Sequence, residues 1–231
     1  MEKIALITDS ACDIDNQTIN KYNIRILPFK IIYSYGEYTD KVDITPEYIY
    51  ENMKTEIPKS SLPSMKDIEA MYKKLTEENY SHVIAAVISS GLSGSYNAFK
   101  LVSERFENIK TYIFDTKSTS LVQGLILKKC GELIEKGMEF KDIIMKIPEI
   151  KRTLHFYFVF GTLEYAKKGG RIGRISGTIG ELLDIKPIVE FDEEYGQCLT
   201  YEKVRGRNKS LKRLADIVDE IKTDRKLSAY V

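Results

Sequence analysis

The chain has 231 residues, of which 43% are hydrophobic and 30% are charged, a composition typical of a globular protein with one large or two modest domains. Its 35 basic and 34 acidic side chains leave a formal net charge of +1, which gives no general reason to expect nucleic-acid binding. No apolar stretch approaches the ~20 residues of a membrane span, so we expect no stable membrane insertion.

The first two thirds of the chain repeat one unit, in which a short apolar run is followed by a polar loop of small residues and then by a helix. The apolar runs are Ile4–Ile7, Val83–Ile88 and Thr111–Phe114. The helices that follow them are expected near residues 15–21, 95–106 and 119–136. This alternation is typical of βαβ units with a parallel sheet, whose ligand sites lie at the carboxyl ends of the strands.

Between residues 24 and 64 the pattern differs. Residues 24–42 predict a hairpin or an irregular strand pair around Gly36. Thr45 followed by Pro46 predicts the start of a helix. The polar stretch 57–64 contains two prolines and is expected to be extended, before another helix at Met65–Glu77.

After Pro148 the pattern changes again, and we expect a domain boundary after residue 150. Residues 1–150 would form an α/β domain, and residues 151–231 a smaller α/β domain with a mixed sheet. In the second part, strands are expected at residues 154–161, 188–192 and 198–204, and helices at 162–170, 175–183 and 208–223. The chain stops in Leu227–Val231, which predicts a strand just beginning, so we expect this domain to be incomplete.

Four hydroxyl-rich loops follow predicted strands. They contain Thr8, Asp9 and Ser10; Ser60, Ser61 and Ser64; Ser89, Ser90, Ser93 and Gly94; and Asp115 and Thr116. Serine hydroxyls and the backbone N–H groups of a helix start bind an anion without a full positive charge, and Ser93 is predicted at an N-cap. The alternative is that each serine only caps a helix and that Asp9 only orders a turn.

Two basic loops lie in the second domain. Arg171 stands among glycines, and Arg205 is followed by Gly206. Arginines presented by glycine turns predict a dock for a phosphate or an acidic partner. The alternative is an ordinary solvated face.

The sequence gives little support for metal binding by the cysteines or for catalysis by the histidines. Cys12, Cys130 and Cys198 are far apart and lack metal-ligand spacing, which fits core packing in a reducing cytoplasm. His82 and His155 precede predicted strands without a partner for a triad. We expect structural roles for both histidines and no metal or cofactor.

No phosphate-binding loop, Gly-x-Ser-x-Gly elbow or His-Glu-x-x-His motif is present. A hydrolase or phosphotransferase with Ser93 or Asp9 as the nucleophile is the alternative enzymatic hypothesis. The absence of a credible base beside either residue disfavours it.

The same loops resemble those of the DegV family. The matching stretches, in the order of the family, are Ile7-Thr8-Asp9-Ser10, Ser60-Ser61-Leu62-Pro63-Ser64, Ile88 to Tyr96, Phe114-Asp115-Thr116, Lys168 to Ile172, and Lys186-Pro187-Ile188 followed by Lys203-Val204-Arg205. The resemblance implies a two-domain α/β fold that buries a long-chain fatty acid in an apolar tunnel. It further implies a FakB-like role, in which the bound acid is presented to a separate ATP-dependent kinase that forms the acyl phosphate.

By position, the resemblance implies that Ser60 or Ser61, together with Ser93 and Gly94, holds the carboxylate. It also implies that Arg171 and Arg205 dock the kinase and the phosphate. Ser60 replaces the usual threonine of the family, and the family's Gly-x-His-x-Gly-Pro-Gly segment does not occur. On this hypothesis the protein is a lipid-binding carrier and not an enzyme by itself.

Overall fold

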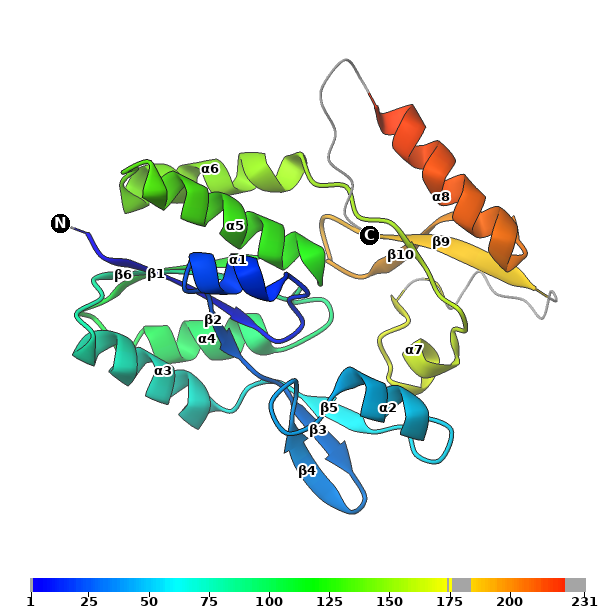
Figure 1. Cartoon of the computed structure of the whole chain (residues 1–231), viewed down its shortest axis with the longest axis horizontal. Helices are drawn as coiled ribbons and strands as arrows, with labels where there is room; N and C mark the ends of the chain where they lie inside the picture. The colour runs from blue at the N-terminus through cyan, green and yellow to red at the C-terminus, as the bar shows by residue number, and fades with distance from the viewer. Residues whose placement is uncertain (1, 174, 176–183, 223–231) are drawn as a thin grey trace. The chain divides into compact units, whose positions relative to one another are not determined.

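The computed structural model describes residues 2–173, 175 and 184–222 and divides into two compact units, Met1–Leu154 and His155–Val231 (Figure 1). The boundary expected after residue 150 falls inside helix α6 (Phe140–Arg152), the last helix of the first unit. No helix was predicted there because Pro148 suggested a break. The helix nevertheless continues through Pro148, since Ile143 and Ile147 give it a fully buried apolar face.

The first unit is built on a four-stranded sheet in the order β2-β1-β6-β7. The strands are β1 (Ile4–Asp9), β2 (Arg25–Leu27), β6 (His82–Val87) and β7 (Lys110–Asp115), and all of their pairings are parallel. Every residue of β6 is buried, as expected for a central strand covered on both faces. The predicted parallel sheet is thus confirmed.

Helices cover both faces of this sheet (Figure 1). Helices α3 (Met65–Glu77) and α4 (Ser95–Ser103) pack together on one face, and α5 (Leu121–Glu135) and α6 pack together on the other. The short helix α1 (Asn16–Lys21) precedes β2. The core under α3 and α4 centres on the buried Tyr72 and Phe99.

Two glycines let α5 lie close to the segment that follows β1. A Cβ atom at Gly131 would stand 2.4 Å from the ring of Tyr22, and one at Gly124 would stand 2.5 Å from Cβ of Ile14. Any larger residue at either position would force the two segments apart. The loop after β1 is therefore held tightly against the start of α5.

A second, three-stranded sheet of the first unit has the order β4-β3-β5 and is antiparallel. Its strands are β3 (Lys30–Tyr33), β4 (Gly36–Thr39) and β5 (Lys59–Ser61), and helix α2 (Pro46–Asn52) begins after the Thr45 N-cap as predicted. Ser60 and Ser61 thus lie within a strand of this small sheet. The prediction that they lie in a loop after a strand was wrong, because pairing with the distant β3 leaves no local signal.

The second unit contains a three-stranded antiparallel sheet in the order β10-β9-β8. Its elements are β8 (Phe158–Val159), α7 (Glu164–Lys168), β9 (Ile185–Phe191), β10 (Cys198–Arg205) and α8 (Arg207–Ile221). The β9–β10 hairpin and α8 confirm the prediction. The expected mixed sheet was wrong for the described strands, and the strand expected over 154–161 is limited to β8. The helix expected over 175–183, apart from its first residue, and the strand expected over 227–231 lie outside the described residues.

The cysteines Cys12, Cys130 and Cys198 are all buried and free, which confirms their predicted role in core packing. Burial raises the pKa of Cys12 and Cys130 to about 12 and that of Cys198 to about 11. Among the described residues, no helix has both the length and the apolar character needed to cross a membrane.

Candidate functional site

Three of the four hydroxyl-rich loops meet at the carboxyl edge of the parallel sheet. Asp9 at the end of β1 accepts a hydrogen bond from the N–H of Ile88 (2.9 Å), which lies just beyond β6. Thr116, just beyond β7, donates through Oγ1 to the carbonyl oxygen of Val87 (2.8 Å). The predicted convergence of these loops is therefore confirmed, and it follows directly from the parallel order of the strands.

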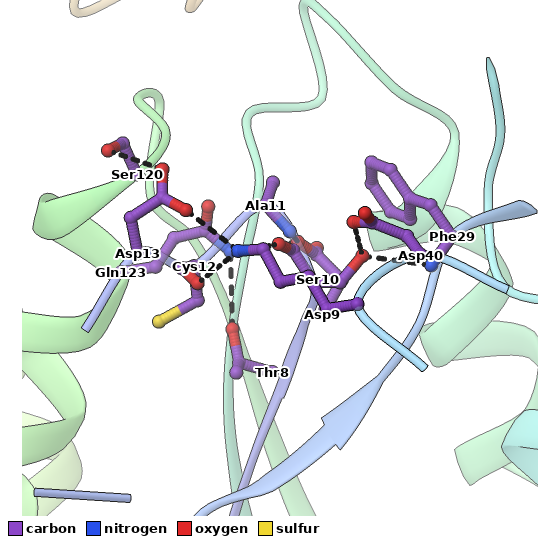
Figure 2. Close-up of polar contacts among 11 residues, drawn as sticks. Thr8, Asp9, Ser10, Ala11, Cys12, Asp13, Phe29, Asp40, Ser120 and Gln123 are labelled. Carbon is purple, nitrogen blue, oxygen red and sulfur yellow. Dashed lines mark hydrogen bonds and ion pairs between the residues drawn. The ribbon is translucent and has the colours of Figure 1, made fainter. Parts of the chain in front are cut away.

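Asp9 is a fully buried organiser of this edge. Besides Ile88, its carboxylate accepts hydrogen bonds from the N–H of Ala11 (3.1 Å) and from Nε2 of Gln123 on α5 (3.0 Å; Figure 2). Burial raises the pKa of Asp9, while the hydrogen bonds from Ile88, Gln123 and Ala11 act in the opposite direction. With no exposed surface, Asp9 cannot reach a substrate as a nucleophile. It orders the edge, as the alternative interpretation of the sequence held.

The neighbours of Asp9 also face inward. Thr8 donates through Oγ1 to the carbonyl oxygen of Ala86 (2.7 Å). Ser10 donates through Oγ to Oδ2 of Asp40 (2.6 Å) and accepts from the N–H of Phe29 (2.9 Å; Figure 2). Thr8 and Ser10 are therefore part of the frame of the edge, and their hydroxyls are occupied within the protein.

Asp115 joins the loops after β6 and β7. It accepts a hydrogen bond from the N–H of Ser90 (3.1 Å) and forms an ion pair with Lys117 (3.1 Å). Burial alone would raise the pKa of Asp115, but the hydrogen bonds from Ser90 and Lys117 outweigh it and hold the pKa below its ordinary value. The ionised carboxylate therefore stabilises the folded state at neutral pH.

The lowered pKa of Asp115 predicts a pH dependence of the free energy of unfolding. Because the folded pKa of Asp115 lies below the ordinary value of 3.8, its contribution is present above that pH and is lost as the pH falls through the folded pKa. We expect Asp115→Asn to reduce the free energy of unfolding at pH 7 and the deficit to shrink near pH 3, measured by urea denaturation. A deficit that grows on acidification would contradict this sign.

Ser93 lies in the turn that leads into α4. Its Oγ is 2.9 Å from Oγ of Ser95 and accepts a hydrogen bond from the N–H of Ser95 (3.2 Å). The N-cap of α4 is Gly94 and not Ser93; the Ser93 hydroxyl accepts its bond from the N–H of Ser95, the first residue of the helix. Ser93 is half-buried, whereas Ser95 is fully buried. Ser93 is thus a half-buried residue directly before the N-terminal end of α4.

Ser60 and Ser61 are exposed on β5, where they pair with Ile31 and Lys30 of β3. Successive strand residues point to opposite faces of a sheet, so only one of the two serines can face a given ligand atom. The next residue, Leu62, stands 3.6 Å from the Cβ position of Gly94. The end of β5 is therefore adjacent to the Ser93 turn, and the fourth loop joins the edge from the small sheet.

The two predicted docking arginines belong to the second unit. Arg171 is exposed and donates to the carbonyl oxygen of Gly169 (2.7 Å). Arg205 is exposed at the end of β10. Both side chains are presented at the surface, which their predicted role requires.

The second unit also carries an aromatic patch that the sequence interpretation missed. Phe158 stands at its centre, with ring centroids 5.5 Å from Phe156, 5.0 Å from Phe160 and 6.0 Å from Phe191. All four are partly exposed. The alternation of Phe156, Phe158 and Phe160 along the chain is the signal that would have placed them on one face.

Lys41 and Gln123 were also missed. Gln123 donates to both Thr8 (3.2 Å) and Asp9, and Lys41 binds the loop after β1. No local pattern marks either residue, since one lies in an irregular turn and the other in a buried helix start.

The structure places His82 in a structural environment. His82 starts β6, at the end of the strand away from Ser93, where Nδ1 is 2.8 Å from Oγ of Ser81 and Nε2 is 3.4 Å from Glu2. Its ring packs on Phe140 at 4.6 Å, which fits the predicted structural role. Within residues 2–173, 175 and 184–222, no group of three or more histidine, cysteine or acidic side chains is placed to hold a metal ion.

The structure thus defines a two-unit α/β protein whose hydroxyl-bearing loops gather at the carboxyl edge of a parallel sheet. The model of the DegV family, described as uncharacterised proteins, matches residues 3–231. The chain belongs to the DegV family.

Relatives of known sequence and structure are similar over nearly the whole chain. A DegV domain-containing protein of Clostridium acetobutylicum is 48% identical over 231 residues, which cover 100% of this chain and 82% of the relative. The crystal structure of a fatty acid binding DegV family protein from Streptococcus agalactiae is 33% identical with a TM-score of 0.89, covering 98% of this chain and 80% of that one. DegV of Bacillus subtilis, a fatty acid binding protein, is 30% identical with a TM-score of 0.86, covering 95% and 78%.

Proposed function

We propose that this protein binds a long-chain fatty acid and holds its carboxylate with Ser93 and with either Ser60 or Ser61. The observation that carries the proposal is the contact of Leu62, which directly follows the β5 serines, with the Cβ position of Gly94, next to the half-buried Ser93 before α4. Solved relatives from Streptococcus agalactiae and Bacillus subtilis, which are fatty acid binding proteins, share this fold.

Neutral hydroxyl and N–H donors suit a carboxylate that must remain reactive. Hydrogen bonds to a charged group are stronger than those between neutral groups, so a few serines and the N–H groups near Gly94 are sufficient to orient it. A buried salt bridge to lysine or arginine would lower the nucleophilicity of the carboxylate oxygen. Hydrogen bonds from neutral hydroxyls leave one carboxylate oxygen of the fatty acid able to attack phosphorus.

The hydrocarbon tail supplies most of the affinity. Each methylene transferred from water contributes about 0.8 kcal/mol, so an apolar surface that accepts a long chain is enough for tight binding. The tail then sets the affinity, and the carboxylate contacts set the orientation of the bound acid.

The fate of the bound acid is transfer to a partner. An ATP-dependent fatty acid kinase would supply nucleotide and metal, the carboxylate oxygen would attack the terminal phosphorus, and ADP would leave. Arg171 and Arg205 would dock the kinase and stabilise the phosphate. The protein is then a cytoplasmic substrate carrier with a fatty acid as its ligand and no cofactor of its own.

Binding and presentation are tested separately. Delipidated protein is titrated with a long-chain fatty acid by calorimetry, and we expect saturable binding of one acid per chain; absence of binding would reject the proposal. Acyl phosphate formation is then measured with a purified fatty acid kinase and ATP. The combined Arg171→Ala and Arg205→Ala variant should retain fatty acid binding but lose phosphorylation, and unchanged phosphorylation would remove the docking role.

A further inference from the structure

The hydroxyls proposed to hold the carboxylate come from two different sheets. Ser93 follows β6 of the parallel sheet, whereas Ser60 and Ser61 lie on β5 of the small antiparallel sheet. A site of this kind works only when its donors stand within about 0.5 Å of their productive positions. The contacts that fix one sheet against the other therefore decide how well the carboxylate is held.

One lysine ties the small sheet to the loop after β1. The ammonium of Lys41 donates to the carbonyl oxygens of Ser10 (2.9 Å) and Cys12 (3.2 Å) and forms an ion pair with Oδ1 of Asp13 (2.7 Å). The preceding residue, Asp40, accepts the hydroxyl of Ser10 (2.6 Å; Figure 2). Two consecutive residues of the small sheet's edge thus bind the same loop.

Lys41 follows the small sheet, just after the row of paired residues that includes Ser61. Lys30 of β3 pairs with Thr39 of β4 on one side and with Ser61 of β5 on the other. Lys41 follows Thr39 by two residues, and its backbone has a positive φ of 61°. A left-handed conformation is uncommon for lysine, and here it accompanies the turn of the side chain toward the loop.

The end of β1 and the loop after it also bind the segments beside the Ser93 turn. Asp9 accepts the N–H of Ile88 (2.9 Å), directly before Ser89, which begins the turn. Asp13 accepts the hydroxyl of Ser120 at the start of α5 (2.9 Å; Figure 2). The loop is therefore bonded to the small sheet on one side and to the parallel-sheet edge on the other.

We propose that Lys41 is a positioning residue of the carboxylate site, which sets the spacing between the β5 serines and Ser93 through the loop after β1. This inference rests on the proposed fatty acid binding and deepens it. Lys41 acts through the loop and not on the ligand.

If Lys41 only stabilised the fold, its removal would lower the free energy of unfolding without a specific effect on carboxylate recognition. The ion pair between Lys41 and Asp13 is partly exposed, with 37% and 57% of the side chains accessible, and such pairs contribute little to folding. Removing the ammonium should therefore alter the spacing of the sheets more than the stability of the fold.

The test compares ligands that differ only at the polar end. Palmitic acid and 1-hexadecanol have the same chain, so their affinity ratio reports how well the carboxylate is recognised. The Lys41→Met variant keeps an unbranched side chain, which must adopt the same left-handed backbone conformation. We expect it to bind palmitic acid about tenfold more weakly and to change the affinity for hexadecanol by no more than about twofold. Lys73→Met, which removes an exposed ion pair on α3, is the matched control and should leave both affinities unchanged.

Two further variants separate positioning from folding. Lys41→Arg keeps the charge and the donors and should restore most of the ratio, while Ser10→Ala removes the bond to Asp40 and should lower the ratio as Lys41→Met does. An unchanged ratio in both Lys41→Met and Ser10→Ala would overturn the inference, as would an equal loss for acid and alcohol. If the native protein binds no palmitic acid, the proposed function itself fails, which is a distinct result.

Discussion

Replacing Ser93 with alanine will weaken the binding of a long-chain fatty acid by about 10- to 100-fold, since a hydrogen bond to a charged group contributes about 1.5–3 kcal/mol. Ser93 is half-buried just before α4, and its bonds to Ser95 hold its hydroxyl in place. Calorimetric titration of delipidated protein measures the loss. The affinity for an alcohol of the same chain length should fall less, because that headgroup carries no charge.

Ser103→Ala is the matched control for this variant. Ser103 is the last residue of α4, and its hydroxyl donates to the carbonyl oxygen of Lys100 (2.9 Å). We expect its affinity for the fatty acid to equal that of the native chain. Equal affinities in the native protein, Ser93→Ala and Ser103→Ala would remove Ser93 from the site.

Replacing Asp9 with alanine will lower the free energy of unfolding by about 3–5 kcal/mol, the loss typical of a buried polar network that loses one member. Three N–H groups, from Ala11, Ile88 and Gln123, would lose the acceptor that the fully buried Asp9 supplies. Urea denaturation at pH 7 measures this loss.

The control for Asp9 is Asp142→Ala, the same change on the exposed first turn of α6. Loss of one carboxylate there should cost about 0.5 kcal/mol through the helix dipole. A loss below about 1 kcal/mol in Asp9→Ala, no larger than an ordinary surface change, would show that its carboxylate does not organise the edge.

The parts of the fold that the sequence predicts are those with local signals. The runs before Asp9, Ser89 and Asp115 are short apolar runs followed by small polar residues, so their alternation with helices indicates a parallel sheet and the meeting of its loops. The Thr45-Pro46 helix start is equally local. The roles of these loops in ligand binding remain predictions.

The features that were missed depend on distant partners. Ser60 and Ser61 become strand residues only by pairing with β3, and Pro148 conceals a helix that exists because its apolar face is buried. The bonds of Lys41 to the loop after β1 join residues that are far apart in the sequence; Cys12, for example, is 29 positions away. Such contacts carry no periodicity that a single sequence displays.

The most direct test of fatty acid binding is native mass spectrometry of the freshly purified chain, before and after delipidation and incubation with palmitic acid. We predict that the protein carries one fatty acid per chain as isolated, or takes up one after incubation, and that Ser93→Ala retains less of it. A native chain that shows neither bound fatty acid nor uptake would contradict the account.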